Sequence, residues 1–223
     1  MATELIKICN LKKEYGHKVI FDNYNFYLNE NEYVIILGKS GQGKSTLLNI
    51  IGLLDDEYNG QYYLVGNDVR NIKDKQKSKL RNEMFGFIFQ NYNLIDDLNV
   101  IDNIYLPYCY SKNRLGKEEK KHISMLIKEF KLDGIKSSKV KSLSGGEKQR
   151  VAIVRALVLN PLIIIADEPT GNLDCENEKI VMDFLRKMKE KGKSIVMVTH
   201  NLNIIKDCDR IIDLSEGVLL SEA

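Results

Sequence analysis

The sequence predicts an α/β fold in which helices cover both faces of a mostly parallel sheet. Two observations support this prediction. Short apolar runs that suit buried strands, such as 162–166 and 194–198, alternate with helical patterns in the second half of the chain. An apolar run over 33–37 leads directly into a glycine-rich loop and then into a helical pattern. With 223 residues, of which 43% are hydrophobic, the chain can form one compact unit with a sizeable core.

The first half of the chain combines strands with a helical segment. Alternating and apolar runs predict three strands, over 5–9, 19–28 and 33–37. The last strand is followed by the glycine loop and a helix over 44–54, then by a strand pair near 61–65 and a buried strand over 85–89. Between about 91 and 142 the pattern becomes helical and polar, with a helix over 117–131. This predicts a helical lobe set apart from the sheet.

The second half of the chain alternates regularly. We expect a helix over 146–159, a strand over 162–166, a helix over 176–191, a strand over 194–198, a short helix and a last strand over 210–214. The three prolines, Pro107, Pro161 and Pro169, are all expected at element boundaries.

Composition excludes several classes of protein. A net charge of +2 with 29% charged residues describes a near-neutral surface, so we expect no nucleic-acid partner. The lysine-rich stretches 73–79 and 117–121 are interleaved with other residues and are typical of solvated helix faces. The four cysteines form no C-x-x-C pair, which favours reduced thiols in a cytosolic protein. We find no leader segment and no apolar run of about 18 residues, so work at a membrane would require another chain.

The glycine loop matches the complete G-x-x-x-x-G-K-[ST] pattern, after a strand and at the start of a helix. Its residues are Gly38, Lys39, Ser40, Gly41, Gln42, Gly43, Lys44, Ser45 and Thr46. Glycines allow successive backbone N–H groups to face phosphates, and the helix N-terminus adds its positive dipole end. Lys44 is expected to reach the β- and γ-phosphates, and Ser45 to bind Mg²⁺. The sequence therefore predicts a nucleoside triphosphate site.

A pair of carboxylates follows the apolar strand 162–166. Asp167 is suited to hold Mg²⁺, and Glu168 to orient or deprotonate the attacking water. Alone, such a pair is equally typical of a solvated loop start. The phosphate loop upstream favours the catalytic interpretation.

A second glycine turn opens a helix at Leu143-Ser144-Gly145-Gly146-Glu147-Lys148-Gln149-Arg150. On this segment the chain resembles the ATP-binding cassette (ABC) family, whose signature motif is Leu-Ser-Gly-Gly-Glu-x-Gln-Arg. The resemblance covers essentially the whole chain, and further family motifs follow in order: Tyr15, the phosphate loop, Gln90, the signature, Asp167-Glu168, Gly171-Asn172-Leu173-Asp174 and His200. Gln42, Lys148 and Cys175 differ from the residues most frequent in the family, but none of these differences removes a catalytic group.

The resemblance assigns roles that single residues would not reveal. Tyr15 would stack on adenine, Gln90 would contact Mg²⁺ and the attacking water, and His200 would contact the γ-phosphate. Ser144, Gly145 and Gly146 would close over the ATP that a second copy holds, with Asp174 helping to link the two sites. The implied assembly is an ATP-dependent homodimer.

The resemblance also implies the ABC-ATPase fold of P-loop NTPases. In this fold a mostly parallel core sheet flanked by helices carries an antiparallel β subdomain and a helical subdomain. We expect one domain over 1–223 with the helical subdomain at about 91–160. The segments 99–108 and 166–174 resemble the branch for lipoprotein release, macrolide efflux and cell division (LolD/MacB/FtsE type).

Members of that branch act with a transmembrane permease that has a large extracytoplasmic domain. The chain is therefore expected to hydrolyse ATP at the cytoplasmic face of the membrane and to power export or mechanical release of a peptide, lipoprotein or drug. The permease contact is expected between 90 and 143, with a groove near Gln90 and Tyr92. Because the chain ends soon after His200, we expect a stand-alone subunit.

Two alternatives belong to other classes. A non-transport ABC ATPase of the DNA-repair or translation-factor type would keep these motifs, but it normally adds a long coiled-coil insertion or a second cassette. A P-loop kinase of small metabolites would keep the phosphate loop but would not need the signature segment.

Overall fold

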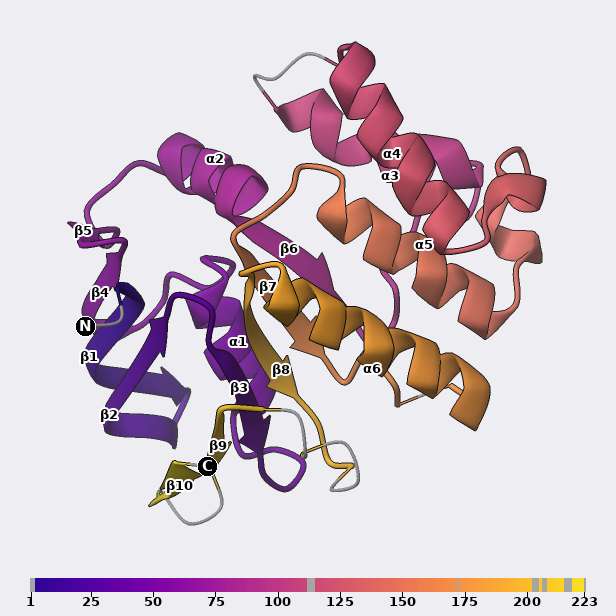
Figure 1. Ribbon diagram of the computed structural model, residues 1–223. Coiled ribbons are helices and arrows are strands. Elements are labelled where there is room, and N and C mark those ends of the chain that lie inside the picture. The colour runs from indigo at the N-terminus through magenta and orange to yellow at the C-terminus, as the bar shows by residue number, and fades with distance from the viewer. Residues whose placement is uncertain are drawn as a thin grey trace.

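The computed structural model describes residues 3–111, 115–171, 173–201, 205, 208–214 and 218–222. A six-stranded sheet crosses the middle of Figure 1, in the order β10-β9-β3-β8-β7-β6. These strands are β3 (Tyr33–Leu37), β6 (Phe85–Ile88), β7 (Ile163–Asp167), β8 (Ser194–Val198), β9 (Arg210–Asp213) and β10 (Val218–Glu222). All neighbours are parallel except β10, which pairs antiparallel with β9. The predicted parallel α/β core is confirmed.

A second sheet is antiparallel, in the order β2-β1-β4-β5. It consists of β1 (Glu4–Tyr15), β2 (Lys18–Asn29), β4 (Asn59–Leu64) and β5 (Asn67–Asp68). Strand β1 continues well beyond the predicted end at Cys9, with irregular register around Asn10, whose φ is 54°. Leu11 and Lys13 then both turn inward and are buried. The prediction stopped too early because a lysine seldom occupies an inward position.

Helices cover both faces of the core sheet. They are α1 (Lys44–Ile51), α2 (Asp74–Met84), α3 (Val100–Tyr110), α4 (Lys117–Glu129), α5 (Gly145–Leu157) and α6 (Cys175–Glu190). The lysine-rich stretches lie at the starts of α2 and α4. The prediction of a solvated face is wrong for Lys77, which is buried and pairs with Asp56 at 3.0 Å. Helices α3, α4 and the start of α5 form a lobe beside the sheet in Figure 1, and the limits 91–160 for this lobe stay a prediction. Within the described ranges, no helix combines the length and apolarity that a membrane span requires.

Two expectations need correction or restriction. Pro107 lies inside α3, so the expectation that it marks a boundary was wrong. Pro107 cannot donate to the Asn103 carbonyl, so one hydrogen bond is missing from the turn before it. The buried Val100 and Ile104 hold this part of the helix against the core. The short helix expected between His200 and Arg210 falls largely outside the described residues.

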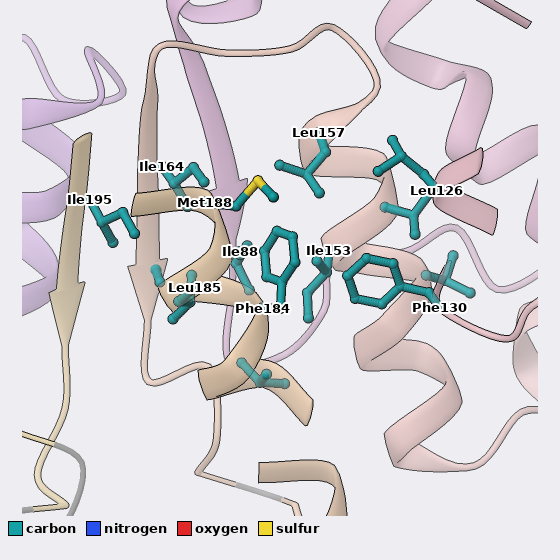
Figure 2. Packing of buried hydrophobic residues seen from close by; sticks show 14 of the residues in the cluster. Ile88, Leu126, Phe130, Ile153, Leu157, Ile164, Phe184, Leu185, Met188 and Ile195 are labelled. Carbon is teal, nitrogen blue, oxygen red and sulfur yellow. The ribbon is translucent and has the colours of Figure 1, made fainter. Parts of the chain in front are cut away.

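The core has two parts, one on each face of the parallel sheet. In β3, Tyr33 and Ile35 face one part while Val34 and Ile36 face the other, as the two-residue period of a strand requires. Figure 2 shows the first part, where side chains from α5, α6 and the end of α4 meet the sheet. This packing fixes the beginnings of α5 and α6 relative to the strand ends.

Candidate nucleotide-binding site

Three neighbouring strands place the predicted site residues at one edge of the sheet. The phosphate loop follows β3, Thr199 and His200 follow β8, and Glu168 follows β7. Because β3, β8 and β7 are adjacent and parallel, their carboxyl ends meet at the same edge. A backbone hydrogen bond extends the pairing of β7 and β8 to Glu168, whose N–H donates to the Val198 carbonyl at 3.0 Å. The edge is the usual ligand-binding position in such sheets.

The phosphate loop has a backbone that only glycine adopts without strain. Gly41 and Gly43 have φ values of 78° and 91°, and a Cβ on Gly38 would lie 2.7 Å from Gln42 Oε1. The loop leads into α1, which has no side-chain cap and no acidic residue in its first turn. The first N–H groups of α1 therefore lack a side-chain acceptor, which suits an anion.

Lys44 lies almost buried within this loop. Its exposure is 8%, and its Nζ donates to the carbonyls of Gly38 at 2.6 Å and Lys39 at 2.9 Å. Among the residues that the structure describes, no carboxylate forms an ion pair with Lys44, so its charge is available to a phosphate.

Two adjoining clefts share Ser40, Lys44 and Glu168. One has a volume of about 570 Å³ and extends to Thr199, His200 and Asp213. The other has a volume of about 420 Å³ and extends to Tyr15, Lys18 and Thr46. Together they connect the predicted adenine-stacking tyrosine with the predicted γ-phosphate histidine, past the phosphate loop. Lys18 and Asp213 were not predicted as site residues, because neither belongs to a recognisable motif.

Glu168 and His200 form a carboxylate–imidazole pair. His200 Nδ1 lies 3.0 Å from Glu168 Oε2, and the side chain of Glu168 is only 19% exposed. Glu168 has a φ of 44°, a left-handed conformation that costs about 1–2 kcal/mol in a residue with a side chain. The side chains of Gln90 and Glu168 both lie beside Gly171, since Gln90 Nε2 and Glu168 Oε2 are each 3.4 Å from the point where a Cβ on Gly171 would stand. Gln90 itself does not line the two clefts.

Ser45 and Asp167 lie close enough for the Ser45 hydroxyl to influence the pKa of the Asp167 carboxyl. Burial raises the pKa of the Asp167 carboxyl, while the Ser45 hydroxyl acts in the opposite direction. The described residues contain no group of three or more His, Cys, Asp and Glu side chains that could hold a metal. A hydroxyl and a single carboxylate fit Mg²⁺, which commonly takes its other oxygen ligands from water and substrate phosphates.

The signature residues and Asp174 do not line the clefts around Lys44. Ser144, Gly145 and Gly146 begin α5, where Ser144 Oγ donates to Glu147 Oε2 at 2.8 Å. Asp174 begins α6 and accepts from the Asn177 N–H at 2.8 Å. Both helix starts are exposed and capped by their own side chains, in contrast to α1. Asn172, between Gly171 and Leu173, lies outside the described residues.

Asn177 belongs to no predicted motif, and the contacts of Gln149 and Arg150 were not predicted. Arg150 donates to Asn177 Oδ1 at 2.8 Å, and Asn177 Nδ2 donates to Asp174 at 2.9 Å, so the signature helix is linked to the start of α6. Gln149 is 1% exposed and donates to the Pro169 carbonyl at 2.7 Å, directly after Glu168. The signature motif contains Gln149 and Arg150, but their partners depend on how α5 packs.

Comparison with known proteins agrees with this geometry. A family profile described as "ABC transporter" matches residues 21–171. The chain is 41% identical to the lipoprotein-releasing system ATP-binding protein LolD of Aquifex aeolicus, over 98% of this chain and 97% of that protein. It is 39% identical to the macrolide export ATP-binding/permease protein MacB of Chlorobaculum tepidum, over 98% of this chain. The chain spans only about a third of that relative, which is 34% covered.

A solved structure shares the fold over almost the full length. It is described as a dimeric, post-hydrolysis state of the ATP-binding cassette MJ0796 bound to ADP and Pi. The TM-score is 0.88 at 37% identity, covering 98% of both chains. The antiparallel sheet beside a parallel core is therefore the ABC-ATPase fold that the resemblance implied. Because the family profile covers most of the sequence and these relatives align over nearly all of it, the chain belongs to the ABC transporter family and is an ATP-binding cassette.

Proposed function

We propose that this chain hydrolyses MgATP as the ATPase subunit of a transporter whose permease is a separate chain. The observation that carries this proposal is the Glu168–His200 pair, 3.0 Å apart, in the same cleft as Lys44. A carboxylate held by an imidazole beside a phosphate-binding lysine is suited to activate water against a γ-phosphate.

Each predicted residue has a role in this proposal. The backbone of 38–46 and Lys44 bind the phosphates, and Tyr15 stacks on the adenine. Ser45, Asp167 and Gln90 would hold Mg²⁺, which would neutralise charge on the phosphates. Glu168 accepts a proton from the attacking water, and His200 orients Glu168 and contacts the γ-phosphate.

Hydrolysis requires a second copy in this proposal. Ser144, Gly145 and Gly146 are exposed or partly exposed at the start of α5 and do not line their own chain's clefts. They would donate to the γ-phosphate held by the other copy, with Asp174 at the contact between copies. The dimeric state of the related cassette MJ0796, described with ADP and Pi, supports this assembly. The dimer would open after hydrolysis, which supplies the conformational change that moves cargo.

The relatives support an export or release system. MacB is described as a macrolide export ATP-binding/permease protein, and LolD as the ATP-binding protein of a lipoprotein-releasing system. We therefore propose a separate permease, with a large extracytoplasmic domain, that would hold this subunit at the cytoplasmic face of the membrane. The cargo would be a peptide, a lipoprotein or a drug.

A groove of about 360 Å³ between α2, α3, α5 and β6 is our candidate for the permease contact. Phe89, Asn93 and Arg155 line it, together with the exposed Tyr110. A groove is expected near Gln90 and Tyr92, and this one lies beside them, because their chain neighbours Phe89 and Asn93 line it. Arg155, which also lines the groove, donates to the Tyr92 carbonyl at 2.7 Å. Gln90 and Tyr92 themselves are not among the lining residues.

Co-expression with the permease tests this contact. Tyr110→Asp places a charge on the groove and should abolish cargo movement while basal hydrolysis is retained. Met125→Asp alters another exposed apolar residue, on α4, and should have no effect. Equal loss of transport and hydrolysis in Tyr110→Asp would refute the assignment.

Phosphate release tests the ATPase itself. Release should require Mg²⁺ and should vanish in Lys44→Met, which removes the charged phosphate ligand. A phosphorylated acceptor in place of free phosphate would indicate a kinase. Failure to co-purify with any permease would favour the non-transport ABC ATPase, the second candidate.

A further inference from the structure

We propose that Lys13 and Asp55 position the ring of Tyr15 for stacking on the adenine base. The inference rests on the proposed ATP site and adds two residues that determine how the base is held. None of the motifs in the sequence contains Lys13 or Asp55, and neither lines the clefts.

Lys13 is a buried cation with a complete set of partners. Its exposure is 1%, and its Nζ lies 2.9 Å from Asp55 Oδ1, 2.8 Å from Asp55 Oδ2 and 2.7 Å from the Glu57 carbonyl. Burying an ammonium group is costly unless it is paired and hydrogen-bonded in this way. The neighbouring Lys12 is instead half exposed and pairs with Glu14 at the surface. Strand alternation therefore directs only one of the two lysines inward.

The same ion pair holds Tyr15 at two points. The Tyr15 hydroxyl donates to Asp55 Oδ2 at 3.2 Å, and the Lys13 Nζ lies over the ring, 4.6 Å from its centroid. Tyr15 is the last residue of β1 and is 50% exposed, so it has little packing of its own to fix its rotamer. The hydroxyl bond fixes the tip of the ring, and the ammonium occupies one ring face. Because Tyr15 is half exposed and lines the cleft beside the phosphate loop, its ring is accessible to a base.

The location of Asp55 connects this arrangement to the phosphates. Asp55 follows α1, and its N–H donates to the Asn49 carbonyl in that helix at 3.2 Å. Helix α1 also carries Lys44 and Ser45 at its N-terminus. The ion pair thus ties the base platform on β1 to the helix that binds the phosphates, which keeps the two halves of one ligand site in a constant relation.

Binding of ATP and of inorganic tripolyphosphate, each measured by calorimetry with Mg²⁺, tests the inference. Part of the ATP affinity comes from stacking of the base on an aromatic side chain. Lys13→Met should therefore weaken ATP binding about tenfold. The affinity for tripolyphosphate should not change, because that ligand has no base. Asp55→Asn should behave like Lys13→Met, Lys13→Arg should retain most of the affinity, and the surface control Lys12→Met should match the wild type. If Lys13→Met weakened the binding of ATP and of tripolyphosphate equally, or changed neither affinity, the inference would be overturned.

A spectroscopic variant gives an independent readout. The chain contains no tryptophan, so Tyr15→Trp introduces a single one at the platform. Its fluorescence should be quenched by ATP and not by tripolyphosphate, and adding Lys13→Met should reduce that quenching at saturating ATP. Quenching that persists in full would overturn the positioning role, even where Lys13→Met has lowered the melting temperature.

A different set of results would refute the proposed function. Lys44→Met should weaken the binding of both ligands, because both carry the phosphates that Lys44 binds. A wild-type chain that binds neither ligand would refute the ATP site itself, whereas a chain that binds both ligands with no base-dependent effect of Lys13→Met would refute only the positioning role.

Discussion

Replacing Glu168 by glutamine should remove hydrolysis while leaving the fold and ATP binding intact. Glutamine has the same size, tolerates the same left-handed φ of 44° at the same cost, and keeps an oxygen that can accept from His200. The melting temperature should therefore be unchanged. The variant loses only a proton acceptor, and general-base catalysis contributes about 10²–10⁴ in rate, or about 3–5 kcal/mol.

The assay is phosphate release at saturating MgATP, with ATP affinity measured in parallel. Glu129→Gln is a suitable control, because Glu129 is a surface carboxylate paired with Lys187 at 3.5 Å and remote from the strand ends. Glu129→Gln should retain wild-type kcat. If Glu168→Gln retained more than a tenth of the wild-type kcat, the assignment of Glu168 as the base would be refuted.

Three further predictions concern the starts of α5 and α6. Gly146→Ala should lower the free energy of unfolding by about 1–3 kcal/mol, because the new Cβ would stand 2.6 Å from Asn177, which Arg150 and Asp174 hold in place. In the control Gly145→Ala, the new Cβ meets only the movable Tyr92 hydroxyl, so the Tm should not fall. The pKa of Glu147 is lowered from its ordinary 4.5 by hydrogen bonds from its N-cap serine, so its stabilising contribution is present above pH 4.5 and is lost as pH falls through the lower folded-state pKa. Thermal melts of Glu147→Gln between about pH 6 and pH 3 should show a weaker acid dependence than wild type. Cys175 is exposed beside the proposed dimer contact, so a short bismaleimide should join two chains only with ATP and not in Cys175→Ser.

The core sheet was predictable because its strands are apolar on both faces and alternate with helices. β3 and β8 have the predicted bounds, since each is a fully buried run that begins after a charged residue and ends before a glycine or a threonine. The end of β1 was not predictable, because Lys13 becomes an inward residue only through Asp55, which lies 42 positions later. Pro107 was misplaced for a similar reason, since packing of α3 outweighs a local breaker in its last turn.

The site was predictable where one motif supplies adjacent residues. Spacing identified Lys44 and Ser45 as phosphate-loop residues, and the structure places them at the start of α1 beside two clefts. The Glu168–His200 pair could not be derived from spacing, because it depends on β7 and β8 being neighbours. The connection from Arg150 through Asn177 to Asp174 could not be predicted either, since it arises where α5 and α6 pack together. Local chemistry is encoded in motifs, whereas contacts between elements depend on the fold.

The claim that a second copy completes the site is tested most directly by the molecular mass of Glu168→Gln with and without MgATP. Sedimentation should show a monomer without nucleotide and a dimer with MgATP. Adding Ser144→Arg places a bulky cation at the start of α5 and should restore the monomer, although each chain still binds ATP through Lys44. A Glu168→Gln chain that stays monomeric at saturating MgATP, or a dimer that Ser144→Arg leaves intact, would contradict the account.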